Sequence, residues 1–217
     1  MEQKLRELEQ IKPWEFNKEV ALGFVEHARR HIPGYDRVIN KSVDTCRDRL
    51  PSNARILDVG CATGKTLSNL KSAGFTNLSG VDSSQAMLDQ CHVSADLYCS
   101  TQLPAGPWDA VLCNWTMHFI NDKKHYLQSV QDSLSDQGFL ILSDKTSLDP
   151  IPVQQYHNFK RRNGTSEQEI LEKQQQVRDI MYINDPLWYL NTLTQVGFNN
   201  IYIIDADWCF TTFFCTK

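Results

Sequence analysis

The stretch from Arg55 to Gly64, RILDVGCATG, constrains the fold of this chain more than any other. Its apolar residues lead into an acid and two glycines, and a helical pattern follows, which is typical of a parallel strand that feeds a helix. Glycines in such a turn let a ligand lie against bare main chain. A second apolar run ends in Asp82, about 20 residues after the turn, where a carboxylate can accept both hydroxyls of a ribose. The stretch therefore predicts a nucleoside site.

The spacing of the glycines separates the candidate ligands. A dinucleotide site uses G-x-G-x-x-G and places a pyrophosphate on the helix N-terminus. Here the turn reads G-x-x-x-G, with Ala62 where a middle glycine often stands, and this fits a nucleoside without phosphates better than NAD. Asp58, on the strand just before the turn, can meet a cationic amino group. A structural strand–turn–helix without a ligand remains the alternative.

This combination resembles motif I, D-x-G-x-x-x-G, of the class I S-adenosylmethionine (SAM) methyltransferases. The resemblance implies SAM as cofactor, or S-adenosylhomocysteine (SAH) as its product.

Alternating strand and helix patterns after residue 54 predict an α/β fold. Such alternation gives a parallel sheet covered on both faces, with ligands at the carboxyl ends of the strands. Two adjacent apolar runs, 200–204 and 208–215, close the chain as a hairpin, so one strand is antiparallel. We expect a three-layer, Rossmann-like sandwich with seven strands. The expected strands before the hairpin are 54–59, 77–81, 96–99, 109–114 and 139–143, and the helices between them are 64–73, 84–92 and 122–134.

The length of 217 residues predicts a single domain, which we divide into four parts. Residues 1–50 form a helical cap or flank, with helices over 18–31, capped by Asn17, and over 35–50. The expected cofactor-binding core is 51–147, followed by a helical insertion over 148–196, where a substrate pocket would be built, and closing strands over 197–217.

Composition excludes several classes of function. A net charge of −4 argues against a non-specific nucleic-acid binder. No apolar run approaches the length of a membrane span, and the charged N-terminus lacks a signal-peptide core. The seven cysteines are scattered without a CxxC pair, which argues against a disulfide framework or a structural zinc site and for a reducing, cytoplasmic setting. We expect no metal and no membrane partner.

The chain also resembles a narrower family, the carboxy-SAM synthases of bacterial tRNA wobble-uridine modification. That family makes carboxy-SAM from SAM and prephenate and is typically dimeric, so the resemblance implies this activity and a homodimer. The matching blocks are WEFN and IPGY within Trp14 to Tyr35, LDVGCATG (Leu57 to Gly64), VDSSQAML (Val81 to Leu88), NWTMHF (Asn114 to Phe119), ILSDKTS (Ile141 to Ser147) and YHNFKRRNGTSEQEI (Tyr156 to Ile170).

The resemblance also implies cofactor contacts residue by residue. Tyr35 closes over the methionine portion, Asp82 and Ser83 hold the ribose and the adenine side, and Asn114 reaches the cofactor from the fourth strand. Cys99 stands where the family has an acid near the adenine, and a thiol is a poor acceptor for an amine. The full set expected to bind the cofactor is Tyr35, Asp58, Gly60, Cys61, Ala62, Gly64, Asp82, Ser83, Met87, Cys99, Ser100 and Asn114.

One departure concerns the extra carboxylate of carboxy-SAM. The family places an arginine for it five residues before the glycine of a late AGF motif. The matching pair here is Gly197-Phe198, which puts Thr192 at that position, and a hydroxyl cannot replace a guanidinium. Arg161, Arg162 and Arg178 are candidate substitutes, although a charge run is usually a solvated face or a contact surface. Thr192 and Arg161 are therefore the candidate substrate residues.

Methyl transfer from a sulfonium is an in-line displacement that requires alignment and desolvation but no covalent nucleophile. A base is needed only when the acceptor is protonated. His118, four residues after Asn114, is the first candidate, and Tyr35 and Asp144 are further ones. The alternative is that His118 simply begins the next helix.

The sequence thus predicts a SAM-dependent methyltransferase that acts on a small molecule. The alternatives are a carboxy-SAM synthase and, from another class, a non-catalytic SAM-binding partner subunit. An enclosed apolar wall beside the sulfonium would favour an enzyme.

Overall fold

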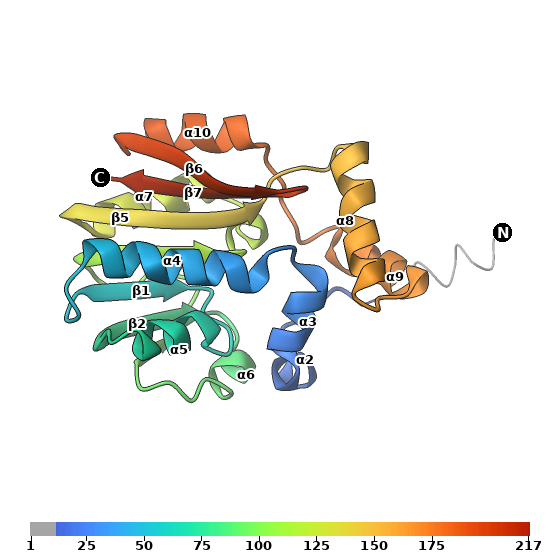
Figure 1. Ribbon diagram of the computed structural model, residues 1–217, viewed down its shortest axis with the longest axis horizontal. Coiled ribbons are helices and arrows are strands. Elements are labelled where there is room, and N and C mark those ends of the chain that lie inside the picture. The colour runs from blue at the N-terminus through green and yellow to red at the C-terminus, as the bar shows by residue number, and fades with distance from the viewer. Residues whose placement is uncertain (1–11) are drawn as a thin grey trace.

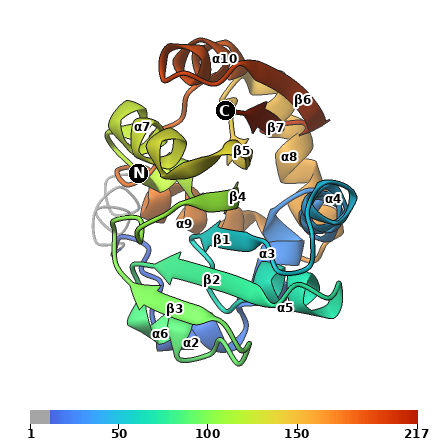
Figure 2. The ribbon, with the colours of Figure 1, turned by 90° about the vertical axis from the view of Figure 1, so that its left-hand side faces the viewer.

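The computed structural model describes residues 12–217, and the predicted helix content before residue 12 lies outside this range. The strands are β1 (Arg55–Val59), β2 (Asn77–Asp82), β3 (Asp96–Cys99), β4 (Trp108–Asn114), β5 (Leu134–Lys145), β6 (Asn200–Asp207) and β7 (Phe210–Thr216). The described residues form one seven-stranded sheet in the order β3-β2-β1-β4-β5-β7-β6 (Figure 2). β7 runs antiparallel to both of its neighbours, whereas β1 to β5 pair in parallel. The predicted α/β sandwich with one antiparallel strand is confirmed.

Alternate residues of the central strands send side chains to opposite faces of the sheet. The covering helices are α4 (Tyr35–Arg49), α5 (Lys65–Ser72), α7 (Lys123–Ser133) and α10 (Pro186–Gln195). Ile56 and Leu112 pack on the face covered by α4 and α5, whereas Leu57 and Val111 pack on the face covered by α7 and α10. These near-continuous apolar strands are buried on both faces, which leaves the strand ends as the place for a polar site.

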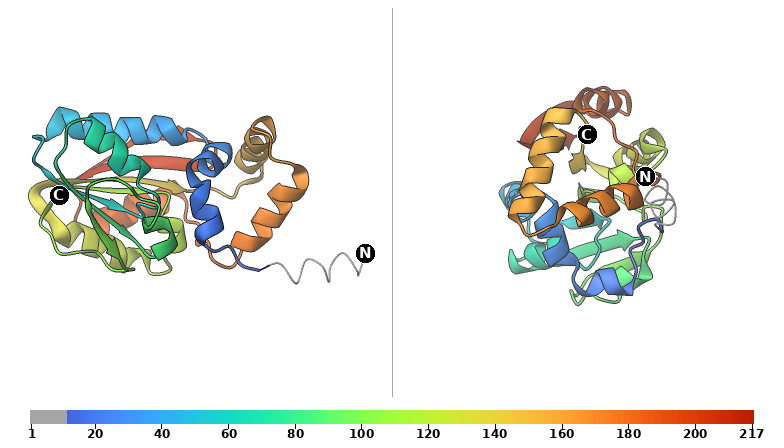
Figure 3. Two further views of the ribbon diagram at one scale, coloured as in Figure 1. Left: turned by 90° about the horizontal axis from the view of Figure 1, so that it is seen from below. Right: turned by 90° about the vertical axis from the view of Figure 1, so that its right-hand side faces the viewer.

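A helical cap lies beyond the carboxyl ends of the parallel strands (Figures 1 and 3). It consists of α2 (Lys18–Leu22), α3 (Phe24–His31), α8 (Pro150–Arg162) and α9 (Glu167–Val177). α3 packs against α8, and α8 packs against α9, so helices that precede β1 and helices that follow β5 form the cap together. Within residues 12–217, none of the helices combines the length and the hydrophobicity needed to cross a bilayer.

Three elements differ from the sequence-based expectation. The helix expected over 18–31 breaks at Gly23, which leaves the helical conformation and separates α2 from α3. The helix expected over 84–92 shortens to α6 (Gln85–Leu88), because the chain turns there to bury Cys91 beneath the glycine turn. The segment 148–196, expected as one insertion, divides in two: α8 and α9 join the cap, whereas α10 buries Tyr189 and Leu193 against the sheet.

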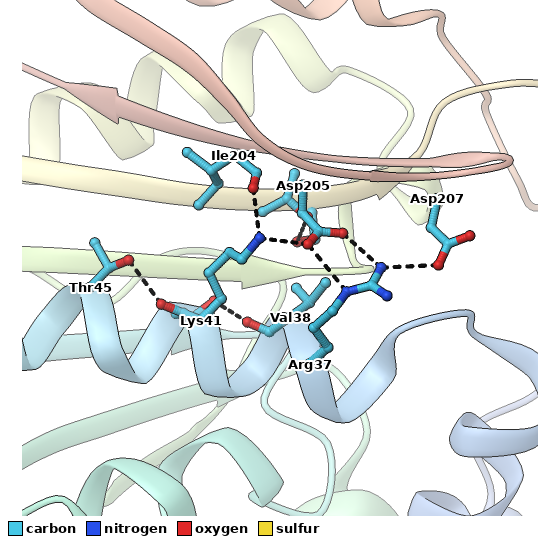
Figure 4. Close-up of polar contacts among 10 residues, drawn as sticks. Arg37, Val38, Lys41, Thr45, Ile204, Asp205 and Asp207 are labelled. Carbon is cyan, nitrogen blue, oxygen red and sulfur yellow. Dashed lines mark hydrogen bonds and ion pairs between the residues drawn. The ribbon is translucent and has the colours of Figure 1, made fainter.

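An ion-pair network ties α4 to the closing hairpin (Figure 4). The Asp205 carboxylate accepts hydrogen bonds from Arg37 Nη2 at 2.9 Å and Lys41 Nζ at 2.6 Å, and Arg37 also reaches Asp207 at 3.0 Å. The Lys41 amino group donates a further bond to the Ile204 carbonyl. Burial opposes ionisation of Asp205, but its bonds to Arg37 and Lys41 outweigh burial and hold its pKa below the ordinary value.

We expect Asp205→Asn to lower the free energy of unfolding at pH 7 by about 0.5–1 kcal/mol, because Arg37 is half exposed and keeps Asp207. The folded-state pKa of Asp205 is lowered, so this contribution is complete above its unfolded pKa and is lost as the pH falls through the folded value. Urea unfolding at pH 7 and pH 3 measures both effects. Asp44→Asn, which alters an exposed pair with Arg47, is the control. Equal stability of Asp205→Asn and the native chain at pH 7 would contradict the expectation.

Candidate active site

A cavity of about 340 Å³ lies between the carboxyl ends of the central strands and the cap. Its floor is formed by residues 58–63 and 81–83, and its roof by side chains of α3, α8 and α9. Aromatic rings make up much of the wall between them. Such a volume is within the range of sites that enclose a small molecule. The aromatic side chains that line it are Trp14, Phe16, Phe24, Tyr35, Trp115, Phe119, Tyr126, Tyr156 and Phe210.

The glycine turn is held by its packing against the loop after β4. Gly60 has φ of 68°, and a Cβ built on it would lie 2.0 Å from Thr116 Oγ1. The Thr116 hydroxyl donates a hydrogen bond to the Val59 carbonyl at 3.1 Å, which fixes it there. The sequence interpretation, that glycine leaves room for a ligand at this position, is therefore corrected: at Gly60 the space belongs to Thr116.

Gly60→Ala should destabilise the chain by about 1–2 kcal/mol through the left-handed backbone alone, and by more through the overlap with Thr116. Urea unfolding of Gly60→Ala, Thr116→Ala and the double variant tests this cause. Thr116→Ala removes the overlapping Oγ1. The double variant should therefore lose less unfolding free energy than the two single variants lose together. Strictly additive losses would show that Thr116 is not the obstacle.

Two carboxylates face the floor of the cavity and differ in how they are satisfied. Asp82, at the end of β2, accepts hydrogen bonds from the main-chain N–H groups of Ala62 at 2.9 Å and Ser84 at 2.8 Å. Asp58, at 2% exposure, accepts no hydrogen bond from any residue in the range 12–217. Burial, together with the nearby charge of Asp82, raises the pKa of Asp58 well above its ordinary value. An unpaired buried carboxylate of this kind is suited to a cationic ligand group.

The end of β4 holds a second unsatisfied group. Asn114 is buried, and neither its Oδ1 nor its Nδ2 has a hydrogen-bond partner within the described part of the chain. The next residue, Trp115, has φ of 57° and stacks on Tyr35 with ring centroids 5.0 Å apart. A bulky residue rarely adopts this conformation, and such outliers gather at functional sites. An orphaned amide beside a constrained aromatic pair indicates a ligand-binding wall.

A buried hydrogen-bond network lies behind the same wall. Asp144, near the end of β5 and fully buried, accepts bonds from the main-chain N–H of His118 at 3.2 Å and from the Tyr189 hydroxyl, and it contacts His118 Nδ1. Burial, followed by the charge of Asp144, raises the pKa of Tyr189. His118 itself lines the cavity, and a carboxylate acceptor at Nδ1 favours the tautomer in which Nδ1 donates and Nε2 is the free acceptor of the ring.

Most of the residues expected from the sequence meet at this cavity. Those that line it are Tyr35, Asp58, Gly60, Cys61, Ala62, Asp82, Ser83, Ser100, Asn114 and His118. Three others lie close but do not line it: Gly64 begins α5, Met87 is fully buried in α6, and Cys99 is exposed at the end of β3.

The two expected substrate residues lie away from the cavity. Arg161 is exposed on α8 and pairs with Glu167 at 2.7 Å. Thr192 is buried at 4% exposure in α10, which packs on the sheet rather than on the cap. The idea that Thr192 marks the anion position is thus corrected, because its place in α10 directs it into packing. An arginine introduced there would be buried within that packing.

Sequence reasoning missed most of the basic side chains that line the cap side of the cavity: His27, His31, Lys145, His157 and Lys173. Lys160 also lines the cavity, and the sequence marks it only as the first residue of a charge run over 160–162, which is more often a solvated face than a substrate clamp. The signal for His27 and His31 is their helical spacing, and their rings stack 4.0 Å apart in α3. Among residues 12–217, no group of three or more His, Cys, Asp or Glu side chains is placed to hold a metal ion.

Comparison with known proteins decides the family. Residues 26–201 match the sequence model of the family described as methyltransferase domain. The chain belongs to this methyltransferase family. A curated relative of this methyltransferase, the carboxy-S-adenosyl-L-methionine synthase of Photorhabdus laumondii, is 29% identical over 210 residues, covering 87% of this chain and 83% of the relative.

Solved structures of low sequence identity share the fold of the methyltransferase. The magnesium protoporphyrin IX methyltransferase of Synechocystis PCC 6803, with bound SAH, superposes with a TM-score of 0.63 at 15% identity, covering 90% of this chain and 94% of its own. An S-adenosylmethionine-dependent methyltransferase of Mesorhizobium loti gives a TM-score of 0.59 at 14% identity, covering 82% of this chain and all of its own. SAM is the cofactor of this class. The unpaired Asp58 and the orphaned Asn114 fit a ligand with a cationic amino group and polar edges.

Proposed function

We propose that this methyltransferase transfers a methyl group from SAM to a small-molecule acceptor enclosed between the glycine turn and the cap. The observation that carries the proposal is one cavity, which has the buried Asp58 on its floor and the orphaned amide of Asn114 in its wall and which extends into an aromatic-walled region under α3, α8 and α9. An enclosed apolar wall next to the cofactor side favours an enzyme over a non-catalytic binding subunit.

The residues of the floor divide the binding of the cofactor among them. When bound, SAM supplies an electrophilic methyl group on a sulfonium. We assign the amino group of SAM to Asp58 and its ribose hydroxyls to Asp82. The side-chain amide of Asn114 would form hydrogen bonds with the cofactor. The stacked rings of Tyr35 and Trp115 exclude water from the region between cofactor and acceptor, which favours displacement of this kind.

His118 is the proposed general base. Asp144 holds the ring by Nδ1, which leaves Nε2 as the atom that can take a proton from the acceptor. Asp144 and Tyr189 act on the acceptor only through His118 and are therefore positioning residues.

Carboxy-SAM synthesis is the second candidate. Curated relatives with that name are 29% identical to this chain, and the match covers most of their length. Incubation of the native protein with SAM and prephenate, followed by mass spectrometry, separates the two functions. We expect SAM to persist without carboxylated product, since the lining that residues 12–217 give the cavity contains no arginine, and a lysine does not offer the paired donors of the guanidinium that the resemblance implies for the extra carboxylate. Formation of carboxy-SAM and phenylpyruvate would promote the second candidate.

Asp82→Ala should weaken SAH binding about 10- to 100-fold, since the loss of an acceptor for two hydroxyls costs about 1.5–3 kcal/mol. Isothermal titration calorimetry with SAH measures the change. Asp89→Ala, at an exposed position that does not line the cavity, is the control. Unchanged affinity in Asp82→Ala would remove the ribose assignment.

The transfer itself is tested with methyl-labelled SAM and the small-molecule fraction of a cell extract. Appearance of label in a low-mass product, dependent on the native protein, supports the function. Failure of SAH to bind at all would overturn it.

The setting of the enzyme is part of the proposal. All seven cysteines are free, which supports a reducing, cytoplasmic location, and the resemblance to a typically dimeric family supports a homodimer. Size-exclusion chromatography with light scattering would test the dimer.

A further inference from the structure

The cap end of the cavity carries a group of cationic side chains that the cofactor does not need. The cap cation cluster comprises Lys145 at the end of β5, Lys160 on α8, Lys173 on α9, and the histidines His27, His31 and His157. Three separate elements thus bring lysines to one space. The acids that line the cavity, Asp58 and Asp82, lie instead on its floor, and the remaining lysine, Lys65, is the first residue of α5.

The lysines of the cluster lack the partners that buried lysines normally have. Lys160 is only 3% exposed, and its Nζ lies 4.1 Å from the ring centroid of Tyr156. Lys145 Nζ lies over the same ring at 5.1 Å, and Lys173 Nζ lies over the ring of Trp14. In the range 12–217, no carboxylate is within 4.0 Å of any of these three amino groups. A ring face compensates only part of the cost of burying an ammonium group.

The electrostatics of the cluster agree with this geometry. Burial, followed by the charge of Lys145, lowers the pKa of Lys160 to about 7, and burial, followed by Lys160, lowers the pKa of Lys173 to about 6. Burial also lowers the pKa of His27 to about 3 and of His31 to about 4. At neutral pH the free protein therefore keeps His27 and His31 uncharged and Lys160 and Lys173 only partly protonated, and an anion placed among the lysines would favour their charged form.

We propose that the cap cation cluster binds a carboxylate or phosphate group of the methyl acceptor, so that the substrate is an organic anion. The inference rests on the proposed function, since it names the class of acceptor. Lys160 and Lys145 hold the acid group over Tyr156, and Lys173 closes on it from α9. The rings of Trp115, Tyr156 and Phe210 contact the body of the acceptor.

Anion binding through these lysines is coupled to protons. The groups that face Lys160 from the elements around it are Lys145, Tyr156, His157, Lys173, His27, His31 and Cys209. None of them is a carboxylate, and Cys209 and the ring of Tyr156 favour the charged lysine too little to offset its burial. Above pH 7 the protein should therefore take up a proton as the anion binds, and calorimetry in buffers of different ionisation enthalpy measures that uptake.

The test uses the full chain, free and saturated with SAH, and three probes of one shape: benzoate, phenyl phosphate and benzamide. Benzoate or phenyl phosphate should bind at least about tenfold more tightly than neutral benzamide, since charge-assisted bonds are the stronger ones. Lys160→Met should lose this preference and keep its SAH affinity. Arg162→Met, an exposed change two residues away on α8, should leave both unchanged. The tighter of the two anions identifies the acid group.

A stability measurement separates binding from a structural role. Lys160→Met removes a buried amino group that has no carboxylate partner in the described part of the chain, so the melting temperature of this variant should rise. If Lys160 had a structural role, the same change should lower the melting temperature. Equal binding of benzoate, phenyl phosphate and benzamide, or an unchanged anion preference in Lys160→Met, would overturn the proposal. SAH binding without anion binding contradicts only this inference, whereas anion binding without SAH binding contradicts the proposed function and with it the identification of the anion as a methyl acceptor.

Discussion

Replacing Asp144 by alanine should lower the free energy of unfolding by about 3–5 kcal/mol, because it removes one side of a buried, hydrogen-bonded network. The main-chain N–H and the ring of His118 and the hydroxyl of Tyr189 would all lose their acceptor inside the core. Each unpaired buried donor costs about 1–3 kcal/mol.

Urea unfolding at pH 7 measures this loss. Tyr189→Phe, which removes one donor and leaves Asp144 two, should cost about 1–2 kcal/mol. Asp136→Ala changes an exposed acid of the same strand and should leave stability within experimental error. A loss below about 1 kcal/mol for Asp144→Ala would mean that water reaches this network.

A conservative change at the same position isolates the role of the network in catalysis. Asp144→Asn keeps the shape but can no longer impose the tautomer that leaves Nε2 of His118 free to accept. We expect kcat to fall while SAH affinity stays unchanged. The pH profile of kcat should shift as well, which a purely structural role would not produce.

The sequence predicted those parts of the fold and site that local chemistry determines. The apolar strand before Gly60 and the acid that ends β2 are read from short patterns, because strand, turn and ribose acceptor follow one another within one unit. Their meeting at one cavity follows from parallel topology. The sequence could not predict that the packing of Thr116 requires glycine at position 60, since Thr116 lies in the loop after a different strand, β4.

Residues whose role depends on burial were beyond sequence reasoning. Lys160 stands in a charge run that is usually solvated, yet helix α8 turns it into the cavity and leaves Arg161 exposed beside Glu167. The spacing of five residues before Gly197 aligns Thr192 with the arginine of the family. The spacing does not determine which face of α10 Thr192 occupies, because packing determines that. Spacing fixes position along the chain, whereas the partner of a helix face is a tertiary property.

Asp58→Asn should weaken SAH binding about 100-fold, since Asp58 is the desolvated carboxylate of the floor, whereas Asp82 already accepts from two main-chain N–H groups. The same change should stabilise the free protein. Burial raises the folded-state pKa of Asp58, so the native chain loses stability as the pH rises from the unfolded pKa through the folded one. Asparagine does not titrate, and the stability difference should therefore grow with pH across that interval.

Together, the two effects predict that SAH reverses the order of the melting temperatures of Asp58→Asn and the native chain. Only a carboxylate that binds the ligand produces this reversal. Without SAH, the melting temperature of Asp58→Asn should exceed that of the native chain at pH 7. With saturating SAH the order should reverse, because stabilisation by a ligand grows with the ratio of its concentration to its dissociation constant. Ser79→Ala, a buried change on the neighbouring strand that does not line the cavity, should show no such reversal. If Asp58→Asn binds SAH as tightly as the native chain, the carboxylate does not meet the amino group, and Asp58 is buried for another reason.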